Sequence, residues 1–119
     1  LRDPLLDALL ALDGTVFFVD ADNRYAVRFV VRQVDADDTR PHGLMYSLTL
    51  HDASGARIMG FDNAQPVEAG KGSRRRWVAF DHRHRFATVR PYDYSDAAAL
   101  LEAFWTQVDS VLREEGIVT

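Results

Sequence analysis

The stretch of sequence that decides the fold is YAVRFVVRQV, residues 25–34. In an extended chain, successive side chains point to opposite faces. The faces of this stretch differ, one apolar and one partly charged: Val27, Phe29 and Val31 against Arg28, Val30 and Arg32. This alternation predicts a strand of an antiparallel sheet with one face on a core and the other nearer to solvent.

Two hairpins extend this strand into a sheet. The first joins residues 15–19 to 25–34, because residues 21–24 between them are typical of a turn. The second joins residues 44–51 to 57–61 around Asp-Ala-Ser-Gly. The sequence therefore predicts a four-strand antiparallel meander.

Helices are predicted at both ends. Asp3 and Pro4 resemble an N-cap and a first-turn proline, and leucines follow with helical spacing until Gly14. Ser95 is expected to cap a longer helix that ends near Gly116. Its apolar residues recur at three- and four-residue steps: Ala97, Leu100, Leu101, Phe104, Trp105, Val108, Val111 and Leu112. The predicted fold class is α+β, an antiparallel meander with a short N-terminal helix and a long C-terminal amphipathic helix packed on one face.

The segment between the second hairpin and the last helix has weaker signals. Residues 63–73 contain one proline and two glycines without periodicity, so we expect a flexible loop. Residues 77–80 and 86–89 are predicted strand pieces on either side of Asp81-His82-Arg83-His84-Arg85.

Length and composition restrict the function classes. The chain has 119 residues of which 47% are hydrophobic, and this predicts a single domain over residues 1–119. It has no cysteine, which excludes disulfides, thiolate zinc sites and a thiol nucleophile. Neither a signal peptide nor a membrane span is recognisable, so a cytoplasmic location is expected.

Charge is strongly segregated along the chain. The net charge is −4, yet residues 71–90 hold a single acid, Asp81, among seven basic residues: Lys71, Arg74, Arg75, Arg76, Arg83, Arg85 and Arg90. Such a stretch is suited to phosphate or to an acidic protein partner, although a solvated run has the same appearance.

His82 and His84 could carry acid-base chemistry. In an extended segment they project to one side, and Asp81, Arg83 and Arg85 project to the other. One neutral and one protonated imidazole could serve as general base and general acid when a ribose 2′-hydroxyl attacks the adjacent phosphate, a reaction that needs no metal or other cofactor. Asp81 would orient an imidazole, and the arginines would stabilise the charged transition state.

Two other interpretations of this segment stay open. The His-Arg alternation also fits the solvated side of a strand. Alternatively, the histidines could bind a divalent metal with Asp81 or Asp62, although the neighbouring arginines would repel a cation.

Three further residues are supporting candidates. Asp62 and Asn63 follow a predicted strand, where they either belong to the site or only shape a turn. Tyr92 either stacks on a base or packs between the sheet and the last helix.

The chain resembles the TumE family of toxins from bacterial type II toxin-antitoxin modules. The resemblance runs from Gly60 to Glu114 and is carried by Gly-Phe-Asp-Asn at 60–63, Phe-Asp-His-Arg-His-Arg at 80–85, Val-Arg-Pro-Tyr-Asp-Tyr at 89–94 and the apolar stripe of the last helix. It implies a small cytoplasmic toxin with a cognate antitoxin as its partner.

Three hypotheses follow for how such a toxin acts. The first is a metal-independent endoribonuclease that uses the histidines and arginines on RNA. The second is a binding module whose arginines dock on nucleic acid or protein, and the third is a metal-dependent phosphate-transfer enzyme. A homodimer is compatible with all three.

Overall fold

The structure is a computed structural model that describes residue 3 and residues 5–37, 40–63, 67–69, 76–78, 82–85, 88–92 and 94–117. Helix α1 spans Leu6–Ala11 and helix α2 spans Ala97–Glu114. The strands are β1 (Val16–Phe18), β2 (Ala26–Gln33), β3 (Leu44–His51), β4 (Arg57–Asp62), β5 (Val67–Ala69), β6 (Arg76–Val78), β7 (His82–Arg85) and β8 (Thr88–Pro91).

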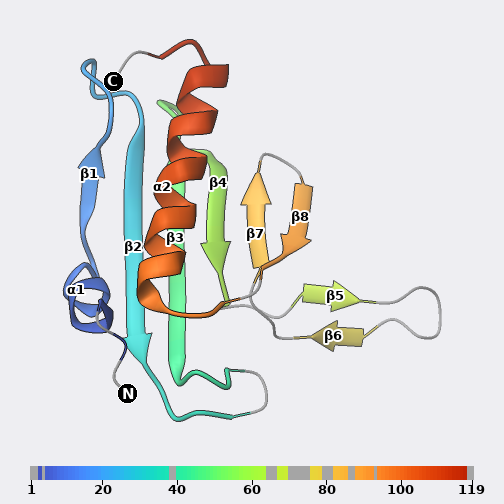
Figure 1. Cartoon of the computed structure of the whole chain (residues 1–119). Coiled ribbons are helices and arrows are strands. Elements are labelled where there is room, and N and C mark those ends of the chain that lie inside the picture. Colours follow the sequence, from blue (N-terminus) through green and yellow to red (C-terminus); the bar gives the residue numbers. More distant parts are fainter. Residues whose placement is uncertain are drawn as a thin grey trace.

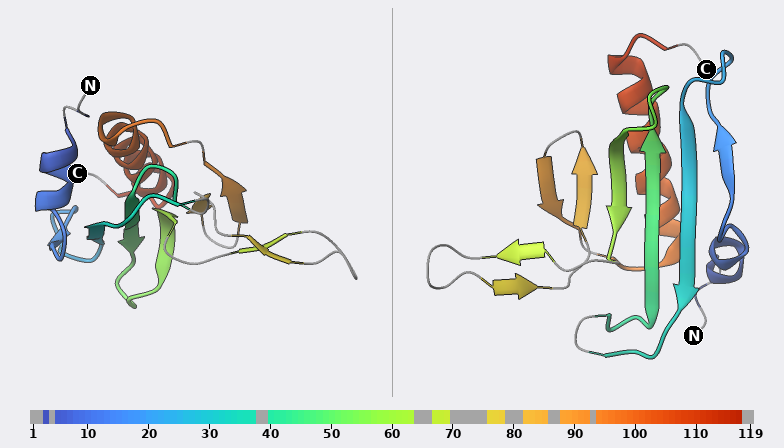
Figure 2. Two further views of the ribbon diagram at one scale, coloured as in Figure 1. Left: turned by 90° about the horizontal axis from the view of Figure 1, so that it is seen from below. Right: turned by 180° about the vertical axis from the view of Figure 1, so that it is seen from behind.

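An antiparallel sheet of six strands forms the body of the protein. Its order is β1-β2-β3-β4-β7-β8, and β5 pairs with β6 in a separate two-stranded sheet. Figure 1 shows α2 lying along one face of β2, β3 and β4, with β7 and β8 to the side of the helix. The view from below in Figure 2 shows α2 on this one face, so the predicted α+β meander with its covering helix is confirmed.

The core lies between the sheet and α2. The predicted alternation in β2 is confirmed, because Val27, Phe29 and Val31 are buried and Arg28 and Arg32 are exposed. The helix contributes the buried residues Ala97, Leu100, Phe104, Val108, Val111 and Leu112. The rings of Phe29 and Phe104 meet edge to face with centroids 5.5 Å apart, which joins the middle of the sheet to the middle of α2.

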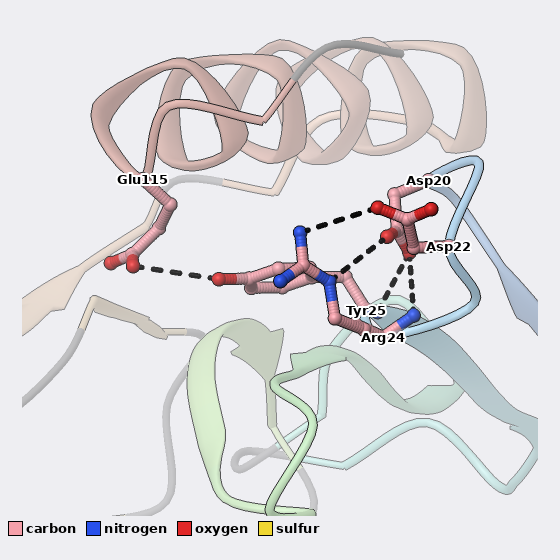
Figure 3. Close-up of polar contacts among 5 residues, drawn as sticks. All are labelled: Asp20, Asp22, Arg24, Tyr25 and Glu115. Atoms are coloured by element: carbon pink, nitrogen blue, oxygen red, sulfur yellow. Dashed lines mark hydrogen bonds and ion pairs between the residues drawn. The ribbon is translucent and has the colours of Figure 1, made fainter.

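Both predicted hairpins are confirmed by their strand pairing. In the first, Phe17 pairs with Val27, and in the second, Leu50 pairs with Met59. The turn of the first hairpin is built around Asp20, whose Oδ1 accepts hydrogen bonds from the amides of Arg24 and Tyr25 at 2.9 and 2.8 Å. Figure 3 shows this turn and the contact that the Tyr25 hydroxyl makes with Glu115 at 3.5 Å, which ties the hairpin to the end of α2.

Burial and the surrounding polar groups shift the pKa of Asp20 in opposite directions. Burial favours the neutral acid, but the amides of Tyr25, Arg24 and Asp22 and the positive charge of Arg24 together lower the pKa of Asp20. The Asp20 side chain is therefore ionised, and as a carboxylate it accepts the hydrogen bonds that hold the turn.

The chain between β4 and α2 differs from the sequence prediction. Residues 63–73 were expected to form a loop, yet Val67–Ala69 is a strand that pairs with Arg76–Val78. The His-Arg segment itself is strand β7, which pairs with β4 and β8. Trp77–Val78 and Thr88–Val89 belong to different sheets, whereas Ala79, Phe80, Phe86 and Ala87 lie outside the described residues.

Helix capping also differs from the prediction. Asp96 and not Ser95 is the N-cap of α2, because its Oδ1 accepts a hydrogen bond from the Ala99 amide at 2.8 Å. Leu5 occupies the N-cap position of α1 without a side-chain cap, whereas Asp3 accepts from the Leu5 amide at 3.3 Å and from the Ala97 amide at 2.7 Å. Asp3 therefore links the start of α1 to the start of α2.

A tyrosine is held beside this junction. Tyr94 lies near Asp3 and Asp96, and burial together with these two negative charges raises the pKa of its phenol far above the ordinary value. The hydroxyl stays protonated and can donate to a carboxylate.

Among the residues that the structure describes, no helix is long and apolar enough to cross a membrane.

Candidate functional site

The candidate site lies where β4 pairs with β7, on the sheet face opposite α2. We call this face the open face. It is defined in β3 and β4 by Thr49, Gly60 and Asp62, which alternate with the core residues Leu48, Leu50, Met59 and Phe61. Because side chains alternate along each strand, directly paired residues share a face.

The strand register brings the histidine positions to the open face. His82 pairs with Asp62 and His84 pairs with Gly60 in β4. In turn, His82 pairs with Pro91 and His84 with Val89 in β8. Two histidine positions that are two residues apart on a strand therefore lie next to an aspartate on the neighbouring strand.

The carboxyl group of Asp62 is almost fully buried. Its side chain is only 7% exposed, and Oδ2 lies 3.8 Å from Nη1 of Arg57, whose side chain is 44% exposed. A buried carboxylate is costly unless cationic or hydrogen-bonding groups compensate it. The sequence alone left Asp62 undecided between a turn residue and a site residue, and its position in β4 rules out the turn.

Beside Asp62, two paired residues of β3 and β4 form the floor of the open face. Gly60 and Thr49 are paired, and a Cβ atom at Gly60 would lie 3.0 Å from both the Leu48 carbonyl oxygen and Thr49 Cγ2. Thr49 is held in turn by its Oγ1, which is 2.9 Å from Nε2 of His51. Sequence reasoning missed this floor, although a single glycine inside a strand pattern is itself a signal of close backbone approach.

Asn63 and Tyr92 have structural contacts. Asn63 is buried, and its side chain accepts from the Tyr46 amide at 2.8 Å and donates to the Leu44 carbonyl at 2.7 Å. Tyr92 packs edge to face on Phe61 with centroids 4.9 Å apart. These contacts join β3 to the end of β4 and close the sheet against α2.

The register pairs the arginine positions of β7 with core positions of β4. Arg83 pairs with Phe61, a core residue beneath α2, and also with Arg90, while Arg85 pairs with Met59. Next to these positions, a cavity of about 360 Å³ lies between β4 and α2, with Phe61, Tyr92, Glu102 and Thr106 among its lining residues. The register thus separates the arginine positions from the histidine positions.

The remaining basic candidates are not part of this sheet. Arg76 lies in β6 and pairs with Ala69 of β5. Lys71, Arg74, Arg75 and Asp81 lie outside the described residues. Within the described part of the chain, no group of three histidine or acidic residues is arranged to hold a metal ion.

The chain matches the model of a known protein family. The family model described as "Toxin TumE" matches residues 8–112. The match therefore extends well beyond the Gly60–Glu114 region that carries the resemblance in sequence, and it includes the first hairpin and the meander. No curated protein and no solved structure matches the chain. Because the family model covers most of the sequence, the chain belongs to the TumE toxin family.

Proposed function

We propose that this toxin is a metal-independent endoribonuclease in which His82 and His84 form the acid-base pair. The observation that carries the proposal is the β4–β7 register, which pairs His82 with Asp62 and His84 with Gly60. Positions two apart on a strand are about 7 Å apart, a separation that leaves room for a phosphate group between two imidazoles.

The register also supports different roles for the two histidines. A carboxylate next to an imidazole favours its protonated form, so His82 beside Asp62 is proposed as the general acid. His84 has glycine as its β4 neighbour and is proposed as the neutral general base. In this proposal Asp62 takes the orienting role that the sequence pattern predicts for Asp81.

The proposed reaction is an internal transesterification. His84 removes the proton of the ribose 2′-hydroxyl, and the 2′-oxygen forms a bond to the adjacent phosphorus. The bond from phosphorus to the 5′-oxygen of the next nucleotide breaks, and His82 protonates that oxygen. The products are a 2′,3′-cyclic phosphate and a free 5′-hydroxyl. Action on cellular RNA would take place in the cytoplasm.

The arginines are proposed to bind RNA phosphates at a distance from the reacting one, because the register separates the Arg83 and Arg85 positions from the histidine positions. Like charges directly opposite each other in a sheet are destabilising, so the Arg83–Arg90 pair favours an anion at that edge. The same pair gives support to the second candidate function, a binding module that acts by sequestering nucleic acid. Lys71, Arg74, Arg75, Arg76 and Arg85 are further candidates for backbone contacts.

The test is cleavage of total cellular RNA by the purified chain with and without EDTA. We expect cleavage that survives the chelator, yields cyclic phosphate ends and is lost in His82→Ala and His84→Ala. Asp62→Asn and Asp81→Asn are a matched pair, and only the first should slow cleavage strongly. Cleavage that requires a metal would contradict the proposal, and so would undiminished cleavage by the double histidine variant. Intact RNA in every reaction would favour the binding module.

A further inference from the structure

Strand β1 forms an edge of the six-stranded sheet, and its outer side is unpaired within the described residues. The Val19 amide donates to the Tyr25 carbonyl and the Phe29 amide donates to the Thr15 carbonyl, at 2.9 and 3.0 Å. In an antiparallel pair, hydrogen-bonded residues alternate with residues whose amide and carbonyl groups point away from the partner strand. Phe17 is thus bonded to β2, and the backbone groups of Val16 and Phe18 face outward.

The side chains of this edge are apolar and exposed. Val16 and Phe18 are 56% and 55% exposed, and they are paired with Arg28 and Ala26 on the open face. Natural edge strands are usually protected by charge or proline, and the sequence Val-Phe-Phe has neither. A hollow of about 470 Å³ adjoins this edge and is lined by Val16, Phe18, Ala26, Arg28 and His51 together with turn residues.

The charges that border the hollow indicate what it would accept. Arg24 is engaged by Asp20 and Asp22 at 3.9 and 3.6 Å, and Asp52 is engaged by the amides of its own turn. Arg28 is exposed, and no ion pair to it is formed within the described part of the chain. An apolar edge beside an unmatched guanidinium fits a ligand that is apolar and carries a carboxylate.

We propose that an extended segment of the cognate antitoxin adds to β1 as a seventh strand of this sheet. Its backbone pairs with Val16 and Phe18, its open-face side chains are apolar, and a glutamate or aspartate at the position opposite Val16 reaches Arg28. Two strand spacings, roughly 10 Å, separate these backbones, which long side chains can span. The inference rests on the pairing with an antitoxin that family membership implies, and it does not require ribonuclease chemistry.

A second copy of the chain fits this edge less well. Self-pairing of a strand of three residues buries far less than the roughly 1,200 Å² of a stable interface. It would also bring a second Arg28 toward the first, without a carboxylate for either. An acidic segment of a different protein supplies that carboxylate, and the rest of that protein can bury further area beyond β1.

The test uses the complex of the full chain with the product of the neighbouring gene, formed by co-expression. Amide hydrogen exchange is compared in the free chain and in the complex. We expect the amides of Val16 and Phe18 to exchange at least about tenfold more slowly in the complex. The Phe17 amide, already bonded to β2, should change much less. Equal exchange at Val16 and Phe18 in both samples would overturn the inference, and failure of the two proteins to bind would overturn it as well.

Variants test the same edge through binding. Arg28→Glu should weaken the complex roughly tenfold or more, whereas Arg32→Glu, on the same strand and face but with no β1 residue opposite, should not. Val16→Pro removes an outward amide only and should also weaken the complex; thermal melting verifies that each variant is folded. Protection of β1 that rises with the concentration of the free chain would assign the edge to a second copy, and protection by RNA alone would assign it to the substrate.

Growth arrest separates this inference from the proposed chemistry. Cells that express Arg28→Glu or Val16→Pro should still be arrested, but the antitoxin should no longer rescue them. A variant that is harmless by itself would overturn the assignment of these residues to the antitoxin edge. Failure of the histidine pair in the RNA assay would leave this result unaffected.

Discussion

Asn63 lies just beyond β4 and forms with Tyr46 the hydrogen bonds that a further strand residue would form. Its backbone amide donates to the Tyr46 carbonyl at 3.1 Å, and its side-chain oxygen accepts from the Tyr46 amide at 2.8 Å. The side-chain nitrogen donates to the Leu44 carbonyl, so the pairing with β3 continues one residue past the end of β4. This arrangement fixes the end of β4 at which Asp62 lies.

Asn63→Ala should therefore destabilise the protein. It leaves the buried Tyr46 amide and the Leu44 carbonyl without their partners, at about 1–3 kcal/mol for each group. Urea unfolding should show a loss of at least about 2 kcal/mol, compared with less than about 0.5 kcal/mol for Gln33→Ala at an exposed strand end. An Asn63→Ala variant with unchanged stability would contradict this account of the β4 end.

Gly60→Ala should strain the floor of the open face. The new methyl group would lie 3.0 Å from the Leu48 carbonyl oxygen and from Thr49 Cγ2. Overpacking of this kind costs about 1–3 kcal/mol, measured as a shift of the unfolding midpoint. Thr49→Ser removes one of the two clashing atoms, so a double-mutant cycle should show partial rescue, and strict additivity would argue against the close approach.

The cap of α2 offers a direct comparison of two neighbouring residues. Asp96→Ala removes the acceptor of the Ala99 amide and should cost about 1 kcal/mol of unfolding free energy. Ser95→Ala should cost far less, because Ser95 is exposed and does not cap the helix. The reverse order of the two effects in thermal unfolding would restore Ser95 as the cap.

Acid should weaken the turn of the first hairpin through Asp20. Its pKa is lower in the folded protein than in the unfolded chain, so the folded state favours the carboxylate. This contribution to stability is complete above the unfolded pKa of about 3.9 and is lost as the pH falls through the folded value. Asp20→Asn should lose stability at neutral pH and show a smaller further loss on acidification. An identical pH dependence in the two proteins would remove Asp20 as its source.

The two histidines are proposed to act on different protons. His82 gives a proton to the leaving oxygen, and His84 removes the proton of the 2′-hydroxyl. A 4-nitrophenyl ester of uridine 3′-phosphate has a leaving group that departs without protonation. On this substrate His82→Ala should retain most of the wild-type rate, whereas His84→Ala should lose about 10²- to 10⁴-fold. Equal losses in both variants would contradict the assignment of His82 as acid and His84 as base.

Local sequence patterns predicted the helices and strands well where an element buries only one of its faces. The alternation in residues 25–34 and the stripe of α2 each report a core face directly, because a strand repeats every two residues and a helix every 3.6. Between residues 63 and 91 the signals located strand residues at 77–78 and 88–89 but missed β5, and the strands there are only three or four residues long. Such short strands are defined by their partners more than by their own composition.

The sequence by itself determined the α+β class, the two hairpins, the covering helix and the alternation that separates His82 and His84 from Arg83 and Arg85. Only the tertiary structure decided which residues of β4 face these positions, because register is a relation between strands distant in sequence. It pairs Asp62 with His82 and Phe61 with Arg83, and it leaves β1 as an edge. The physical reason is that hydrogen bonding between strands and burial against α2 select one register, and neither is encoded within a single segment.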